Sequence, residues 1–295
     1  MKLAFYLMNS KGYQTLKGFL NNYGADSIEY IVTAKDKNVG KDYYLEINEI
    51  CKSYNVTIYN RKDELPKFNG YKLAVGWRWL IQDTSNLIVM HDSLLPKYRG
   101  FSPLVNMLIN GEKEIGVTAL FASKNYDEGN IIMQKKVSIS YPIKIQDAIM
   151  KVSYLYIDLV ISIYELLINN NKLISIPQDH NQATYSLWRD EEDYMLDWTK
   201  SSSTLKRTID AVSFPFSGAK AYLNNKIISI VDAVEVEDVV IENRDIGKVL
   251  FISNGHPVVV CGKGLLKIIE AYDSNKKSVL PLKNFRSRFE KEKKQ

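Results

Sequence analysis

The chain has 295 residues, of which 45% are hydrophobic and 25% charged, the composition of an ordinary globular protein long enough for two domains. Its net charge is +5, but residues 283–295 hold six basic and two acidic residues, so the rest is near neutral, without the basic excess of nucleic-acid-binding domains. The apolar runs are far shorter than the roughly 20 residues of a membrane span. The two cysteines, Cys51 and Cys261, are far apart in the sequence, and the chain has no CxxC motif or His/Cys cluster, so no metal site is predicted. This use of cysteine fits a cytoplasmic protein.

The first 90 residues alternate between short apolar runs and helical patterns. The runs predict buried strands at Leu3–Met8, Ile28–Val32, Val56–Tyr59, Lys72–Val75 and Leu87–Met90. Helices are predicted between the early strands, at Tyr13–Leu20 and Tyr43–Ser53. Such alternation is typical of an α/β fold with a doubly wound, mostly parallel sheet.

The middle of the chain continues this domain. Two further strands are predicted at Val117–Ala122 and Ile131–Ser138, joined by a loop that carries Asp127. A long apolar-periodic stretch, Ile145–Leu167, predicts a helix that closes the domain before the turn at Asn169–Asn171.

From Ser201 onward the pattern changes to short strands with few helices. A short helix is expected at Thr204–Ser213. Strands are expected at Ala219–Leu223, Lys226–Val231, Lys248–Ile252, Val258–Val260 and Leu265–Tyr272. The sequence therefore predicts an α/β catalytic domain at residues 1–200, including a linker, and a smaller β-barrel domain at residues 201–295.

His91, one of three histidines, directly follows the apolar run Leu87–Met90. A polar residue at the C-terminal end of a strand in an open α/β sheet lies where such folds bind ligands. That position suits a general base, with an aspartate to orient it and stabilise its protonated form. A histidine after an apolar run is, however, more often structural, so position alone does not assign a function.

The string His91 to Gly100 reads H-D-S-L-L-P-K-Y-R-G, and Asp127-Glu128-Gly129 follows, with Asp127 36 residues after His91. This pattern resembles the signature of the folate-dependent formyltransferases. The resemblance covers nearly the whole chain and is nearest to the nucleotide-sugar N-formyltransferases, in the two-domain layout of methionyl-tRNA formyltransferase. It implies a Rossmann-like N-terminal domain and an OB-like C-terminal domain.

The resemblance also implies site residues. His91 and Asp127 would be catalytic. The expected folate-binding residues are Asp127 and the segment Gly76, Trp77, Arg78, Trp79 and Leu80. The expected substrate-binding residues are Ser10, Lys11, Gly12, Ser93, Leu94, Pro96, Tyr98, Arg99 and Gly100. Two alternatives stay open among them: the Ser10–Gly12 turn could bind a phosphate or be an ordinary turn, and Arg99 could bind a phosphate or order its loop.

One position departs from the family pattern, which is Asn-x-His with the Asn side chain helping to hold the oxyanion. Val89 stands two residues before His91 in place of that Asn. Losing one oxyanion donor can cost on the order of 10²–10³ in rate. Ser93, Asn106 or a backbone N–H could substitute, or the chain could be a non-catalytic binder of folate or nucleotide sugar.

The resemblance implies a cytoplasmic N-formyltransferase. It would move a formyl group from 10-formyltetrahydrofolate to the amine of a dTDP- or UDP-linked amino-deoxy sugar, for lipopolysaccharide, O-antigen or related surface polysaccharide. No membrane or nucleic-acid partner and no metal are expected, and a homodimer is possible. The enzyme alternative is methionyl-tRNA formyltransferase, although Met8-Asn9-Ser10 replaces that enzyme's usual Gly-Thr-Pro after the first strand.

Overall fold

The computed structural model describes residues 1–293, and the chain divides into two compact units that interleave along the sequence. The first unit comprises Met1–Leu104, Lys113–Ile139 and Asp147–Leu187. The second comprises Val105–Glu112, Ser140–Gln146 and the chain from Trp188 onward. The domain boundary expected between residues 200 and 201 stays a prediction.

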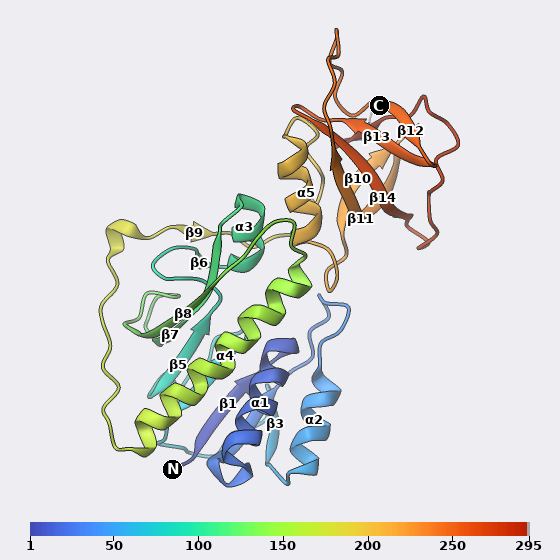
Figure 1. The fold of residues 1–295 in the computed structure, drawn as a ribbon. Coiled ribbons are helices and arrows are strands. Elements are labelled where there is room, and N and C mark those ends of the chain that lie inside the picture. The colour runs from blue at the N-terminus through green and yellow to red at the C-terminus, as the bar shows by residue number, and fades with distance from the viewer. Residues whose placement is uncertain (294–295) are drawn as a thin grey trace. The chain divides into compact units, whose positions relative to one another are not determined.

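A seven-stranded sheet forms the centre of the first unit, in the order β3-β2-β1-β4-β5-β7-β8 (Figure 1). Its strands are β1 (Leu3–Leu7), β2 (Ile28–Thr33), β3 (Ile58–Asn60), β4 (Lys72–Val75), β5 (Leu87–His91), β7 (Glu114–Phe121) and β8 (Ile131–Ser138). The five strands from β3 to β5 are parallel, and β7 and β8 join antiparallel. The winding direction reverses between β1 and β4, the place where open α/β sheets bind ligands.

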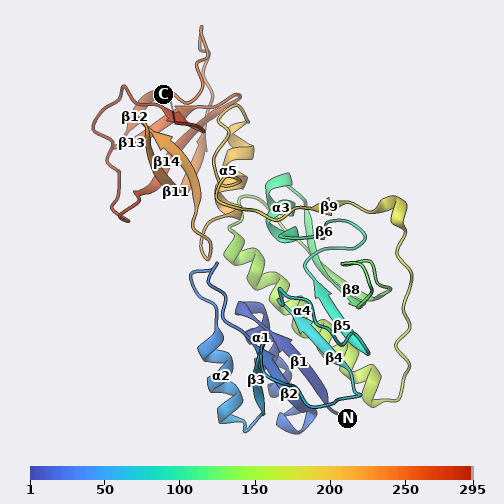
Figure 2. The same cartoon turned by 180° about the vertical axis from the view of Figure 1, so that it is seen from behind.

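Helices α1 (Asn9–Tyr23), α2 (Tyr44–Ser53) and α4 (Ile145–Ile168) lie together on one face of this sheet, as the two opposite views show (Figures 1 and 2). Sequence patterning missed several short elements because they span too few residues to show a period. These are α3 (Pro103–Asn110), the paired strands β6 (Arg99–Gly100) and β9 (Tyr185–Ser186), and 3-10 turns at Ala25–Ser27 and His180–Gln182.

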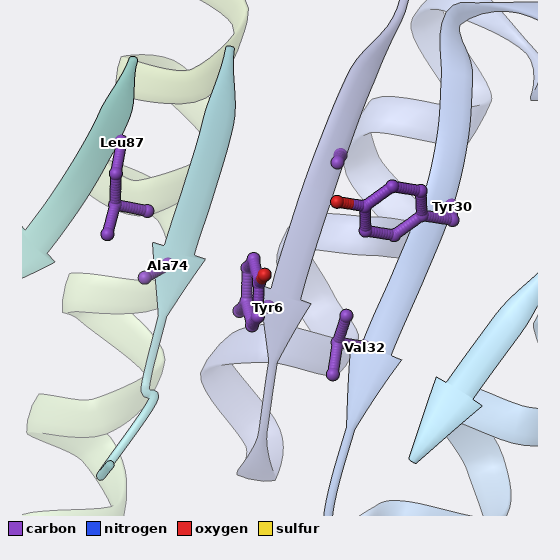
Figure 3. Packing of buried hydrophobic residues seen from close by; sticks show 6 residues of the cluster. Tyr6, Tyr30, Val32, Ala74 and Leu87 are labelled. Carbon is purple, nitrogen blue, oxygen red and sulfur yellow. The ribbon is translucent and has the colours of Figure 1, made fainter. Parts of the chain in front are cut away.

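The opposite face of the sheet carries an aromatic cluster rather than these helices. The cluster consists of Ala4, Tyr6, Tyr30, Val32, Ala74 and Leu87, all buried, and five of its side chains are labelled in Figure 3. Trp77 and Val89 pack against the cluster, and Tyr6 meets Trp77 edge to face with ring centroids 5.2 Å apart. Aromatic pairs of this geometry stabilise beyond their buried area.

The second unit contains a six-stranded antiparallel sheet in the order β12-β13-β14-β11-β10-β15. Its elements are α5 (Ser202–Ala211), β10 (Ala219–Leu223), β11 (Lys226–Val236), β12 (Val249–Ser253), β13 (His256–Val260), β14 (Leu265–Asp273) and β15 (Phe289–Glu290). Ser201 caps α5 by accepting a hydrogen bond from the Thr204 N–H at 3.2 Å. The expected α/β sheet followed by a C-terminal β domain is confirmed, whereas closure into an OB-like barrel stays a prediction.

Within residues 1–293, every helix is too short or too polar to cross a bilayer.

Candidate active site

His91 is the last residue of β5 and is 7% exposed. Its Nδ1 atom lies 3.4 Å from Oδ1 of Asp127, which sits on the connection between β7 and β8. This separation is longer than a good hydrogen bond, as is common for catalytic groups before substrate binds. The structure thus brings the two candidate catalytic side chains together at the C-terminal end of β5.

One loop supplies further partners to both side chains. The Nε2 atom of His91 lies 2.8 Å from the carbonyl oxygen of Tyr98, and the N–H of Gly100 donates to Oδ2 of Asp127 at 2.8 Å. Both ring nitrogens of His91 therefore face oxygen acceptors. An imidazolium can donate to both acceptors, whereas a neutral ring can donate to only one.

Arg99 lies between these two loop residues and is only 1% exposed. Its guanidinium donates to Oε1 of Gln178 from Nε at 3.1 Å and from Nη2 at 2.7 Å. Glu128 and the Tyr185 hydroxyl lie at 3.4 Å from Nη1, and His180 Nδ1 lies at 3.3 Å. Of the two interpretations left open for Arg99, this burial favours the one in which it orders the loop.

The other predicted loop residues are also engaged within the protein. Ser93 is fully buried and its hydroxyl donates to the Lys97 carbonyl at 2.7 Å. The Pro96 carbonyl accepts from the Thr184 N–H at 3.2 Å, and Leu94 packs closely over Gly116. These residues give the loop its shape.

Asp92, the residue after His91, lies in a partly buried cluster that sequence analysis did not single out. Its carboxylate is paired with the ammonium of Lys11 on α1 and with the hydroxyl of Tyr156 on α4. Burial alone would raise the pKa of Asp92, but Lys11 and Tyr156 outweigh it and hold that pKa below its ordinary value. Burial, with the nearby Asp92 charge, raises the pKa of Tyr156 well above its usual range.

This cluster gives Lys11 a different partner from the one expected. Its side chain is 17% exposed and is ion-paired with Asp92, so a substrate phosphate would have to compete with that carboxylate. Its neighbour Gly12 sits against β1, because a Cβ there would lie 3.0 Å from the Leu7 carbonyl carbon. Ser10 is partly buried in the first turn of α1, a helix with no side-chain cap at Met8.

The segment predicted to bind folate follows β4. Gly76 has a φ of +63°, and a Cβ there would lie 2.9 Å from the Met8 carbonyl oxygen, which requires glycine. The indole Nε1 of Trp77 is buried without a hydrogen-bond partner. Trp79 stacks edge to face on Trp77 with centroids 5.4 Å apart, and Leu80 is exposed.

Arg78, in the same segment, extends toward the end of β2. Its Nη1 donates to both carboxylate oxygens of Asp36 at 2.7 Å, and Asn9 donates to Asp36 at 3.0 Å. Burial opposes ionisation of Asp36, but these hydrogen bonds and the Asn38 N–H hold its pKa below the ordinary value. Arg78 remains 44% exposed.

Val89, which replaces the family's Asn, faces the aromatic cluster. Among the possible substitutes for the Asn, Ser93 already donates its hydroxyl proton to the Lys97 carbonyl oxygen. Asn106 belongs to the second unit, where its Oδ1 accepts from Arg189 at 2.7 Å. That contact occupies an acceptor atom of Asn106, so Asn106 Nδ2 and a backbone N–H both remain candidates for the oxyanion donor.

The two cysteines are both buried, and burial raises the pKa of each thiol to about 12. Across residues 1–293, no group of three or more His, Cys, Asp or Glu side chains is arranged to hold a metal ion.

Comparison with protein families gives two matches. Residues 65–152 match the family described as formyl transferase, and residues 189–288 match the formyl transferase C-terminal domain. The chain belongs to the formyl transferase family. The expectation of a formyl-transferring enzyme is therefore confirmed.

Two curated relatives of this formyltransferase are named methionyl-tRNA formyltransferase. The one from Thermotoga neapolitana is 36% identical over 181 residues, which cover 61% of this chain and 56% of the relative. The one from Fervidobacterium nodosum is 27% identical over 273 residues, which cover 86% of each chain.

Solved structures show the same fold. A sugar 3N-formyl transferase, WlaRD, solved in the presence of dTDP and 5-N-formyl-THF, has a TM-score of 0.66 and 19% identity, covering 94% of this chain and 98% of the other. The N-formyltransferase from Helicobacter canadensis, in complex with folinic acid and dTDP-3-aminofucose, has a TM-score of 0.66 and 18% identity, covering 92% and 100%. A formyl-folate co-substrate, as expected from the sequence, fits these neighbours.

Proposed function

We propose that this formyltransferase moves a formyl group from 10-formyltetrahydrofolate to the amine of a nucleotide-linked amino sugar. The observation that carries the proposal is the approach of His91 Nδ1 to Asp127 Oδ1, at 3.4 Å, at the C-terminal end of β5. A histidine beside a carboxylate at this edge of an α/β sheet is suited to accept a proton from an attacking amine.

In this mechanism His91 takes the proton that the amine loses as its nitrogen bonds to the formyl carbon. The resulting imidazolium faces two acceptors, the Tyr98 carbonyl and the Asp127 carboxylate. Asp127 itself is oriented by the Gly100 N–H. The protonated ring is thus stabilised where it forms. It then returns the proton to N10 of the folate as the tetrahedral oxyanion collapses, which releases neutral tetrahydrofolate and regenerates neutral His91.

The folate pocket would be formed by the segment from Gly76 to Leu80, with Asp127. The unpartnered, buried N–H of Trp77 supports this assignment, because a buried donor without an acceptor costs about 1–3 kcal/mol unless a ligand satisfies it. The pterin of a folate carries carbonyl and ring-nitrogen acceptors of the required kind.

A nucleotide-linked sugar is favoured as acceptor by two observations. The solved structures described above include proteins crystallised with dTDP or a dTDP-amino sugar. The net charge of the chain outside the basic C-terminal segment is near zero, whereas tRNA binding depends on neutralising many phosphates.

The uncapped N-terminus of α1, with Ser10 and Gly12, is where we place the sugar-nucleotide phosphates. The product would enter a surface polysaccharide such as lipopolysaccharide O-antigen.

Methionyl-tRNA is the second candidate acceptor, because the curated relatives carry that activity in their names. The two acceptors share the chemistry at His91 and differ in size and charge. Formylation of tRNA would weaken steeply with salt, whereas formylation of a small nucleotide sugar would not.

The test is a panel assay with purified full-length chain and 10-formyltetrahydrofolate. Amino-deoxy sugars linked to dTDP or UDP, with the amine at different ring carbons, are offered separately from methionyl-tRNA. Mass spectrometry then identifies which acceptor gains a formyl group. We expect at least one amino sugar to be formylated, and transfer to methionyl-tRNA alone would overturn the proposal.

A further inference from the structure

We propose that Gln178, together with Arg99, is a positioning residue that holds Asp127 beside His91. This inference rests on the proposed roles of His91 and Asp127. Gln178 lies 51 residues after Asp127, in an extended segment between α4 and β9, and is 7% exposed.

Every hydrogen-bonding atom of the Gln178 side chain is used. Its Nε2 donates to the Asp127 carbonyl at 2.7 Å and to the Gly129 carbonyl at 2.8 Å. Its Oε1 accepts both bonds from Arg99, at 2.7 and 3.1 Å. A primary amide offers two N–H donors and two lone pairs, so this side chain is saturated.

Two hydrogen bonds hold Asp127 in place. Gln178 Nε2 donates to its main-chain carbonyl, and the Gly100 N–H donates to its carboxylate. Gly100 follows Arg99 directly, and Arg99 is itself held by Gln178. The side chain of Gln178 therefore joins the Asp127 loop to the loop that contacts both candidate catalytic groups.

The loop at residues 123–129 depends on these two hydrogen bonds from Gln178 to keep its conformation. Residues 123–126 are solvent-exposed or nearly so and form no regular structure. Asp127 has a φ of +55°, a left-handed conformation that is uncommon outside glycine and persists only when surrounding contacts impose it. Without the two bonds from Gln178, we expect the loop to relax and the Asp127 carboxylate to move away from His91.

The discriminating variant is Gln178→Glu. It keeps a carboxylate oxygen as acceptor for the buried Arg99 but removes both N–H donors to the Asp127 loop. The matched control is Gln182→Glu, which makes the same change four residues later in an exposed side chain whose Nε2 donates to Asp179 Oδ2 at 2.8 Å. We expect Gln178→Glu to lower kcat by up to about 10²-fold with little change in either KM, because a displacement of about 1 Å near the reacting groups can cost that much. Gln182→Glu should leave kcat unchanged.

A double-mutant cycle separates positioning from a merely structural role. If Gln178 acts through Asp127, then adding Gln178→Glu to Asp127→Asn should lower kcat by less than about twofold further. An equal loss of kcat in both backgrounds would overturn the proposal.

A second readout does not depend on substrate. The Gly100 amide donates to Asp127 Oδ2, so its hydrogen exchange should accelerate in Gln178→Glu and stay unchanged in Gln182→Glu. Unchanged hydrogen exchange at Gly100 would refute the positioning role of Gln178. This result would not depend on which formyl acceptor the enzyme uses. Should Gln178→Glu fail to fold, Gln178→Asn replaces it, because its shorter side chain keeps the amide but cannot span Arg99 and both carbonyls.

Discussion

The imidazole of His91 and the carboxylate of Asp127 meet at 3.4 Å although 36 residues separate them. The meeting follows from the antiparallel end of the sheet: His91 pairs with Thr118 of β7, and Asp127 lies on the connection that leads from β7 to β8. The loop from Tyr98 to Gly100 also contacts both groups. Three segments thus converge on one pair of side chains.

The first prediction concerns the proposed base. His91→Asn should lower kcat by at least about 10²-fold, because general base catalysis contributes typically 10²–10⁴. Binding of folate and nucleotide sugar, measured by calorimetry, should change little since the pocket remains. His256→Asn, a change in the second unit where His256 bonds the Ile268 carbonyl, is the matched control. Near-normal turnover in His91→Asn would mean that another group takes the proton.

The second prediction concerns the partly buried ion pair of Lys11 and Asp92. Asp92→Asn should destabilise the fold by about 3 kcal/mol, because it leaves the ammonium of Lys11 without its counter-ion. The double variant Lys11→Met, Asp92→Asn should recover part of that loss. Urea unfolding of both single variants and the double variant measures the coupling, and strictly additive losses would show that the pair is not coupled.

The third prediction concerns acid stability through Asp36. Its folded-state pKa lies below the unfolded value near 3.9. The ionised carboxylate therefore contributes stability above that unfolded value, and the contribution is lost as pH falls through the folded pKa. Unfolding midpoints between about pH 6 and pH 3 should fall less steeply in Asp36→Asn than in the wild type. Parallel curves would mean that Arg78 and Asn9 do not stabilise the charged form.

The fourth prediction addresses Val89. Val89→Asn should leave formyl transfer at best unchanged, because the side chain faces the aromatic cluster and we expect another group, Asn106 or a backbone N–H, to hold the oxyanion. An amide without a partner there should cost roughly 1–3 kcal/mol of stability, measurable by thermal unfolding. Clear activity only in Val89→Asn, with none in the wild type, would favour the non-catalytic binding protein.

The sequence predicted the positions of the strands around the site well because β1, β2, β4 and β5 are short, mostly apolar runs. β4 spans Lys72–Val75 as predicted, and α4 differs by one residue. The start of α1 was placed at Tyr13 rather than Asn9, since Asn9-Ser10-Lys11 has the composition of a turn although it forms the first helical turn. Elements of two residues, such as β6 and β9, lack any period to detect.

The supporting residues of the site could not be predicted in the same way. Nothing in the string Pro177-Gln178-Asp179 marks Gln178, because its role depends on contacts with residues about 50 and 80 positions earlier in the chain. Asp92 did carry a signal, a charged residue directly after a buried strand, which requires a buried partner. That partner, Lys11, was instead assigned to substrate.

The most direct measurement is a competition assay in one solution. Wild-type chain is given 10-formyltetrahydrofolate with equal concentrations of methionyl-tRNA and the best amino-sugar nucleotide from the panel, and the ratio of the two kcat/KM values is read from the formylated products. We expect the ratio to favour the amino sugar by at least about tenfold at physiological salt. Formylation of both acceptors should fall by at least about 10²-fold in His91→Asn. A ratio favouring methionyl-tRNA would contradict the proposed function.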